Sequence, residues 1–291
     1  MNDRNAQEPI QYVLTVNCPD GPGLVHAVSG FVTQHGGNIL ESQQFDDRQN
    51  QRFFLRVRYE AANGATTLEG MRSDFKPIAT RHGMNWQLWK ALTPYRTLIM
   101  VSRFGHCLND LLFRWHTGAL QVEIPAIVSN HLDLEPLARH YGVPFHHIPV
   151  TSQTKHAAEE KLLALADSLN IDLVVLARYM QILSDDLCTR LEGRAINIHH
   201  SFLPSFKGAK PYHQAFERGV KLVGATAHYV TADLDEGPII EQDVVRVDHR
   251  ATADDLVAAG RDVECQVLAR AVAWHAQTRI LLNGHRTVVF R

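Results

Sequence analysis

Residues 195–208 read A-I-N-I-H-H-S-F-L-P-S-F-K-G, and the second half of the sequence can be arranged around them. The first five residues alternate as a strand does, so Asn197 and His199 share one of its faces. Proline and glycine then break the strand into a loop. A carboxamide and an imidazole at this spacing can stabilise a developing oxyanion and move a proton. A third polar group is expected from Asp235, in a tight acidic turn between two strand-like segments.

Strand-like and helical segments alternate on both sides of this stretch. Residues 171–177, I-D-L-V-V-L-A, form a nearly continuous apolar run that is typical of a strand buried on both faces of a parallel sheet. The pattern predicts a doubly wound, mostly parallel, Rossmann-like α/β domain over residues 95–291. Such sheets bind ligands at the carboxyl ends of their strands. Residues 178–183, the Asn/His strand and the loop after Ser102 all follow strand ends, so we expect them to surround one site.

The N-terminal part of the chain has a different organisation. Its periodicities predict the order β-α-β-β-α-β over residues 9–90, which is the ferredoxin-like arrangement. In the strand R-F-F-L-R-V-R, residues 52–58, alternation points the apolar side chains inward and Arg56 outward. Pro77 lies inside the second helix and predicts a kink or a shortened helix. Pro94, in a short linker, marks the boundary to the second domain.

Composition limits the class of protein. A chain of 291 residues with 45% hydrophobic content can bury two cores, and a net charge of −2 gives no reason to expect nucleic acid or an anionic membrane as partner. The polar N-terminus lacks the apolar region of a signal peptide, and no apolar run approaches the roughly 20 residues that span a bilayer. The four cysteines lie far apart without a C-x-x-C pair, which argues against a disulfide framework or a zinc site. We therefore expect a soluble, cytoplasmic protein.

Taken singly, these residues have simpler interpretations. An N-x-H pair alone is commonly a hydrogen-bonded strand end. His199 and His200 are adjacent and should face opposite ways, so they do not form an obvious metal site. Cys107, near a predicted helix start, is a formal nucleophile candidate but more simply a small buried side chain. No Walker loop and no G-x-G-x-x-G follows the first strand of the α/β domain, which argues against nucleotide phosphates as the main ligand.

Two motifs in the first domain carry a resemblance. D-G-P-G-L-V at residues 20–25 follows the first strand, and G-G-N-I-L at residues 36–40 precedes the second. Together they resemble the ACT domain. The resemblance implies pairing through sheet edges, hence a homo-oligomer, and a possible amino-acid effector near the first glycine turn.

The second domain resembles the folate-dependent formyltransferase family through two long motifs. N-I-H-H-S-F-L-P-S-F-K-G begins at Asn197, and A-T-A-H-Y-V-x4-D-E-G-P-I-I-E-Q covers residues 225–242. The resemblance implies that Asn197, His199 and Asp235 act on the formyl group of 10-formyltetrahydrofolate. In that family the segment Y-M-Q-I-L at residues 179–183 corresponds to a loop that binds the pterin. The resemblance implies that this loop, the acidic turn and the strand before the turn contact the folate through the following residues: Met180, Gln181, Ile182, Leu183, His228, Thr231, Ala232 and Asp233.

Two features narrow this resemblance to the formyltetrahydrofolate deformylases. An ACT domain precedes the formyltransferase-type domain, and the sequence S-R-F-G-H-C-L-N-D-L-L after Val101 lacks the Gly-Ser-Asn loop with which glycinamide ribonucleotide formyltransferases hold a phosphate. Water is then the implied acceptor, with formate and tetrahydrofolate as products and no metal or cofactor needed. Two alternatives stay open: a formyltransferase to some amine, and a catalytically weak sensor of amino acid and folate.

Overall fold

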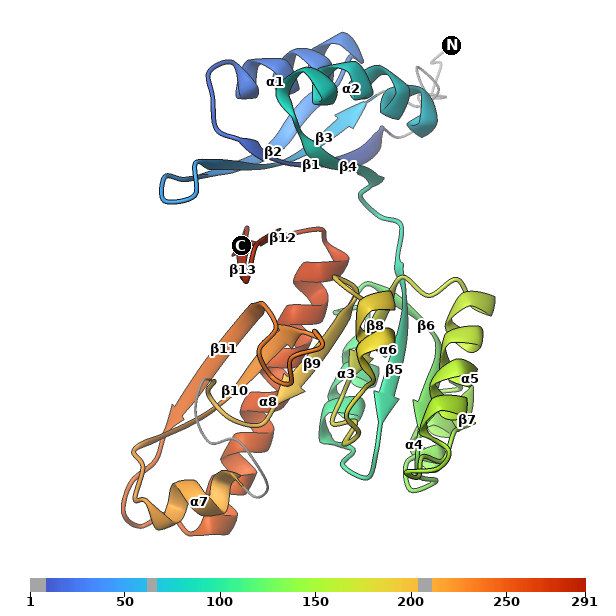
Figure 1. The fold of residues 1–291 in the computed structure, drawn as a ribbon, viewed down its shortest axis with the longest axis vertical. Helices are drawn as coiled ribbons and strands as arrows, with labels where there is room; N and C mark the ends of the chain where they lie inside the picture. Colours follow the sequence, from blue (N-terminus) through green and yellow to red (C-terminus); the bar gives the residue numbers. More distant parts are fainter. Residues whose placement is uncertain (1–8, 62–66, 204–210) are drawn as a thin grey trace, which may run out of the picture. The chain divides into compact units, whose positions relative to one another are not determined.

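The structure, a computed structural model, describes residues 9–61, 67–203 and 211–291 of the chain. The loop expected after Leu203 falls within residues 204–210 and so lies outside the described residues. The chain divides into two compact units, each built around its own large sheet (Figure 1). One unit takes the residues up to Thr93 with 277–283 and 288–291, and the other takes Pro94–Ala276 with Gly284–Thr287. The sequence had placed all residues after 95 in the second domain.

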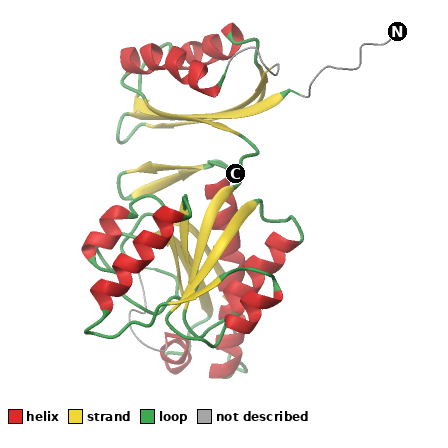
Figure 2. Ribbon diagram, turned by 90° about the vertical axis from the view of Figure 1, so that its right-hand side faces the viewer, coloured by secondary structure: helices red, strands yellow, loops and turns green. Residues whose placement is uncertain are grey.

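The first unit has the predicted β-α-β-β-α-β order. Its elements are β1 (Ile10–Pro19), α1 (Leu24–Gln34), β2 (Asn38–Asp47), β3 (Arg52–Ala61), α2 (Leu68–His82) and β4 (Asn85–Lys90). The strands form an antiparallel sheet in the order β2-β3-β1-β4, and both helices cover one of its faces (Figure 2). Leu14, Phe31 and Phe75 are fully buried between sheet and helices. Pro77 does not shorten α2, since the helix continues to His82.

The other face of this sheet is covered, which corrects the expectation for Arg56. Two short strands near the C-terminus pair with each other, β12 (Ile280–Asn283) and β13 (Arg286–Val289). Arg56 is 2% exposed and donates to the carbonyl oxygens of Gln277 and Thr278 and to the carboxylate of Glu41. Phe54 packs against Leu281 and Phe290 on the same face. The predicted alternation of side chains along β3 is therefore correct, but both faces of this strand are buried.

The second unit is a three-layer α/β domain, as predicted. Its parallel strands and their helices are β5 (Tyr95–Val101), α3 (His106–His116), β6 (Val122–Ser129), α4 (Glu135–His140), β7 (Phe145–His147), α5 (Lys155–Ser168), β8 (Leu173–Leu176), α6 (Asp185–Arg190) and β9 (Ala195–His199). After these come α7 (Pro211–Glu217), β10 (Leu222–Tyr229), β11 (Ile239–Arg246) and α8 (Ala253–Ala276). The sheet order is β11-β10-β9-β8-β5-β6-β7, with helices on both faces (Figure 2).

Strand direction in this sheet positions the site. β5 pairs in parallel with β6 and β8, and β8 pairs in parallel with β9. β10 turns back and pairs antiparallel with both β9 and β11. The carboxyl ends of β8 and β9 therefore meet the start of the turn that joins β10 to β11. None of the helices in the described residues is long and apolar enough to cross a membrane.

Candidate active site

The central strand β9 supplies the first two polar groups of the site. Its register pairs Asn197 with His228 and His199 with Thr226 on the neighbouring antiparallel strand. Both Asn197 and His199 line the same cavity. The cavity has a volume of about 380 Å³, within the range of pockets that bind small organic ligands.

Asp235 comes to β9 from the turn between β10 and β11. One of its carboxylate oxygens lies 3.2 Å from His199 Nδ1 and 3.7 Å from His228 Nε2. Burial by itself raises the pKa of Asp235, but the hydrogen bonds and charges of the two histidines outweigh it, and the net pKa lies well below the usual range. Asp235 is therefore a carboxylate at neutral pH. Because a carboxylate only accepts, His199 Nδ1 carries a hydrogen and donates to Asp235.

His199 Nε2 has a special position among these atoms. It is buried and has no hydrogen-bond partner among the described residues. His199 itself is only 6% exposed, and it lines the cavity. A buried, unpartnered imidazole nitrogen in a cavity wall is suited to exchange a proton with a bound molecule.

His228 fixes the amide of Asn197. Its Nδ1 lies 2.9 Å from the carbonyl oxygen of Tyr229, which only accepts, so Nδ1 carries the hydrogen. One N–H of the Asn197 amide faces Nε2 of the same ring, with Nδ2 and Nε2 3.2 Å apart. The second N–H of the Asn197 amide remains available to the cavity. His228 thus acts on the site by orienting Asn197 as well as by contacting Asp235.

Gly237 makes this tight turn possible. A Cβ at this position would lie 1.7 Å from the Tyr229 carbonyl oxygen and 3.2 Å from His228 Nδ1. We expect Gly237→Ala to destabilise the protein by at least about 1–3 kcal/mol, since the clash is with backbone that cannot rotate away. Thermal or urea unfolding measures this. Gly30→Ala, where a Cβ meets nothing within 4 Å, is the matched control and should not lower stability. Equal effects of the two changes would contradict the packing described for the turn.

The loop after β8 also lines the cavity. Met180, Gln181, Ile182 and Leu183 line it, as expected from the sequence, and so do Thr231 and Ala232 of the turn. Asp233 does not line it. Its side chain is exposed, and its backbone carbonyl accepts a hydrogen bond from the Thr231 hydroxyl within the turn.

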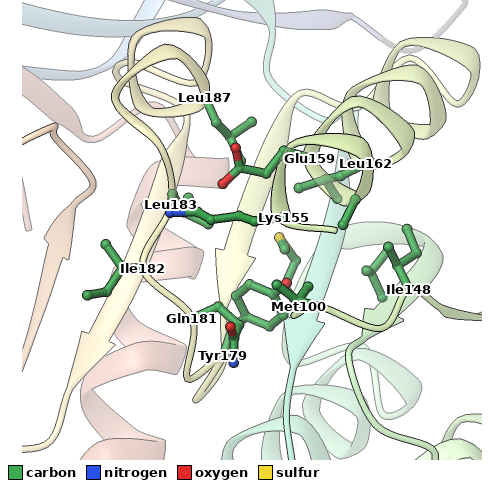
Figure 3. Close-up of a pocket in the computed structure, with 13 residues that line it drawn as sticks. Met100, Ile148, Lys155, Glu159, Leu162, Tyr179, Gln181, Ile182, Leu183 and Leu187 are labelled. Carbon is green, nitrogen blue, oxygen red and sulfur yellow. The ribbon is translucent and has the colours of Figure 1, made fainter. Parts of the chain in front are cut away.

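The loop after β8 is anchored from behind. Ser102 Oγ accepts from the backbone N–H of Met180 and donates to Asn130 Oδ1. Glu159 of α5 accepts from the backbone N–H of Ser184. On the far side of this loop, Lys155, Glu159 and Tyr179 surround a second, much smaller pocket (Figure 3). The loop therefore separates two hollows and is held at both of its ends.

The sequence did not identify a polar cluster that reaches the site from α3 and α8. Glu264, whose side chain is 1% exposed, accepts from the Tyr212 hydroxyl and lies 2.7 Å from His106 Nε2. Arg178 lies 3.5 Å from the same carboxylate and lines the cavity. The signal in the sequence was a carboxylate on the apolar stripe of a helix, between the buried residues Val263 and Val267.

The expectation for His200 was wrong. Its ring stacks on that of His199, with centroids 5.1 Å apart and planes at 23°, and it lines the same cavity. The strand ends at His199, so the alternation of faces does not extend to the next residue. Burial first, and then the charges of Arg178 and His199, lower the pKa of His200 to about 4. The ring is therefore neutral at physiological pH.

Among the residues that the structure describes, one group has the donor types and spacing for a metal ion. The ligand atoms of His106, Cys107 and Glu264 lie within 4.8 Å of one another. The Glu264 carboxylate is already bound by His106 and Tyr212, and the nearby guanidinium of Arg178 repels a cation. A hydrogen bond with Cys265, and then burial, raise the pKa of Cys107, so this residue is an inert thiol.

Comparison with known proteins agrees with this architecture. The profile of the formyl transferase family matches residues 95–272, and that of the ACT domain matches residues 12–67. The chain is therefore an ACT domain followed by a formyl transferase domain, as the motifs in each half predicted. A glycinamide ribonucleotide transformylase from Symbiobacterium toebii is 31% identical, with a TM-score of 0.64, over 68% of this chain and 95% of that one.

Other relatives match along nearly the whole chain. A formyltetrahydrofolate deformylase of Corynebacterium sp. (strain P-1) is 55% identical over 98% of this chain and 99% of its own length, and that of Bacillus subtilis is 47% identical over 95% and 93%. The crystal structure of the deformylase from Burkholderia mallei has a TM-score of 0.93 and 52% identity over 97% of this chain and 100% of that one. The chain belongs to the formyltetrahydrofolate deformylases, which are hydrolases.

Proposed function

We propose that the protein hydrolyses 10-formyltetrahydrofolate to formate and tetrahydrofolate, and that the reaction takes place between β9 and the turn that carries Asp235. The observation that supports this most directly is the meeting of Asn197, His199 and Asp235 at one wall of a cavity large enough for a pterin. An amide donor, a free imidazole nitrogen and a carboxylate are the groups that hydrolysis of a formamide-like bond requires.

The roles of the three residues follow from their contacts. The oxygen of a water molecule attacks the formyl carbon while His199 Nε2 takes one of its protons. The carbonyl oxygen becomes an oxyanion, and the free N–H of Asn197 stabilises it. Asp235 orients the ring and stabilises its protonated form. The C–N bond then breaks, N10 of the folate receives a proton from the imidazolium, and formate leaves with the second proton of the water passing to solvent.

The loop of residues 179–183 supplies the surface for the pterin. Met180 and Ile182 are 50% and 62% exposed, which is unusual for large apolar side chains in a cavity wall. A flat aromatic ring can cover them, while backbone N–H and C=O groups of the same loop pair with its polar edge. The anchors at Ser102 and Glu159 hold this loop in place before the substrate binds.

The test is turnover in buffer that contains no amine. Purified protein is mixed with 10-formyltetrahydrofolate, and formate and tetrahydrofolate are both measured. Equal amounts of the two products are expected, because water is the acceptor. Binding of the folate without formate, followed by turnover once an amine is added, would contradict hydrolysis and support transfer to that amine. Binding without turnover under either condition would support the folate sensor.

We also propose that the ACT domain binds a small effector and joins chains into a homo-oligomer. β2 is an edge strand of its sheet, and Ile39, Leu40 and Phe45 on it are exposed. Exposed apolar residues on an open strand edge favour pairing with another chain. Light scattering is expected to give a mass that is a multiple of the 32.8 kDa of one chain, and Phe45→Lys should reduce it. A monodisperse monomer in the unmodified protein would contradict this proposal.

A further inference from the structure

Arg178 is a buried cation that its neighbours do not satisfy. Its side chain is 10% exposed, and Nε and Nη1 are buried without a hydrogen-bond partner among the described residues. The Glu264 carboxylate lies 3.5 Å from Nε, where it makes an ion pair and no good hydrogen bond. The ring of Phe104 lies 5.5 Å from Cζ on one side. A guanidinium carries five N–H donors, and leaving buried donors unused costs stability.

The backbone of Arg178 is also in an unfavourable conformation. Its φ angle is +66°, in the left-handed region that residues with a Cβ rarely adopt. Asp235, which lines the same cavity, has a φ angle of +58°. Such conformations persist where the surrounding structure enforces them, and they concentrate at functional sites. Two strained residues with charged side chains therefore line one cavity.

The register of the sheet places Arg178 next to the reacting groups. β8 and β9 lie side by side (Figure 1), and Leu176 pairs with Asn197 in parallel. Two residues further along each chain stand Arg178 and His199. Both line the cavity, and the ring of His200 stacks on His199 beside them. Arg178, with its unused donors, thus lines the same cavity as the proposed site of attack on the formyl carbon.

Glu264 does not satisfy the hydrogen-bond donors of Arg178. Its two carboxylate oxygens are each engaged at 2.7 Å, one by Tyr212 and the other by His106. Arg178 contributes to this cluster only at a distance, so its donors can turn to a ligand while Glu264 keeps its partners. A guanidinium with several free N–H groups in one plane matches the two oxygens of a carboxylate.

We propose that Arg178 forms a subsite for the small carboxylate that hydrolysis releases, formate, directly beside His199. This inference rests on the proposed function, in which a neutral formyl group becomes an anion inside a cavity that already holds the Asp235 carboxylate. Without a cation there, the product would be repelled as it forms. The glutamate tail of a folate also carries carboxylates. The burial of Arg178 and its place level with His199 favour the small product over this flexible tail.

Direct binding of formate tests the subsite without any turnover. [13C]Formate is titrated into the full-length protein in the absence of folate, and its line width gives the dissociation constant. Arg178→Gln is expected to weaken binding about tenfold or more, because charge-assisted hydrogen bonds are lost. Arg178→Lys keeps the positive charge but not the planar guanidinium, so its affinity for formate should lie between those of the unmodified protein and Arg178→Gln. Arg139→Gln, at a side chain that is 76% exposed, is the control and should bind as the unmodified protein does.

The outcomes separate this inference from the proposed function. Formate binding that is unchanged in Arg178→Gln overturns the subsite. The subsite is also overturned if Arg178→Gln weakens the binding of p-aminobenzoylglutamate but not that of formate. Loss of formate binding in Arg178→Gln, in a protein that does not hydrolyse 10-formyltetrahydrofolate, keeps the subsite and rejects the function. Near-ultraviolet circular dichroism verifies the fold of each variant. Should Arg178→Gln not fold, the lysine variant decides, since unchanged affinity there would reject the bidentate contact.

Discussion

Asp235→Asn is expected to lower kcat/KM for 10-formyltetrahydrofolate by a factor of about 10² to 10⁴, the range that a positioned acid–base group contributes. The carboxylate now accepts from His199 Nδ1, which leaves Nε2 free to take a proton from water. An asparagine amide can instead donate to Nδ1, and the hydrogen of the neutral ring then moves to Nε2. The ring loses its function as a base although its position hardly changes. Initial rates of formate and tetrahydrofolate release measure the effect.

The substitution is well suited to separate chemistry from structure. Asparagine has the shape of aspartate and tolerates the left-handed backbone at residue 235, where φ is +58°. Binding of tetrahydrofolate, followed by fluorescence, should therefore change little. Asp254→Asn removes an exposed carboxylate from the first turn of α8 and serves as the control. A rate for Asp235→Asn within threefold of the control would show that Asp235 has no part in the reaction.

The local pattern of the sequence was sufficient for β9 and for the turn after β10, but it did not predict α6, α7 or the pairing of β12 with β13. Alternation over five residues placed Asn197 and His199 together, and the acidic turn was recognisable from its residues alone. The same reasoning failed for His200, because the strand ends one residue before it. A period of two gives faces only while the backbone stays extended. Where a strand stops is set by its partners, and these are distant in sequence.

The other differences have non-local causes as well. Arg56 was expected in solvent because its strand has a clear apolar face, but residues near the C-terminus cover the second face. Pro77 removes one hydrogen bond from α2. The helix nevertheless continues, because Met71 and Phe75 before the proline and Ala79 after it are all buried. In each case tertiary packing overrides a correct local preference, and no window of the sequence contains both partners.

Arg178 shows the same limit at the functional site. The sequence placed the segment after β8 near the ligand, and the cavity includes it. The sequence could not predict that the side chain of Arg178 is buried, because this burial depends on Phe104 and on Glu264 from α8. The positive φ of Arg178 is likewise invisible in a sequence that has no glycine there. Buried charges of this kind become visible only when the elements are assembled.

Asn197→Ala is expected to lower kcat by about 10² to 10³, equivalent to roughly 2.7–4 kcal/mol of lost transition-state stabilisation. The alanine removes the N–H that faces the oxyanion and also the partner of His228 Nε2, while the Asp235–His199 pair stays intact. The pH dependence of the remaining activity should therefore match that of the unmodified protein, whereas Asp235→Asn should alter it. Asn109→Ala, on the exposed face of α3, is the control for removal of an amide. An increase in KM with unchanged kcat would mean that Asn197 binds the folate before the reaction and contributes nothing specific to the oxyanion, because only an interaction that strengthens in the transition state raises kcat.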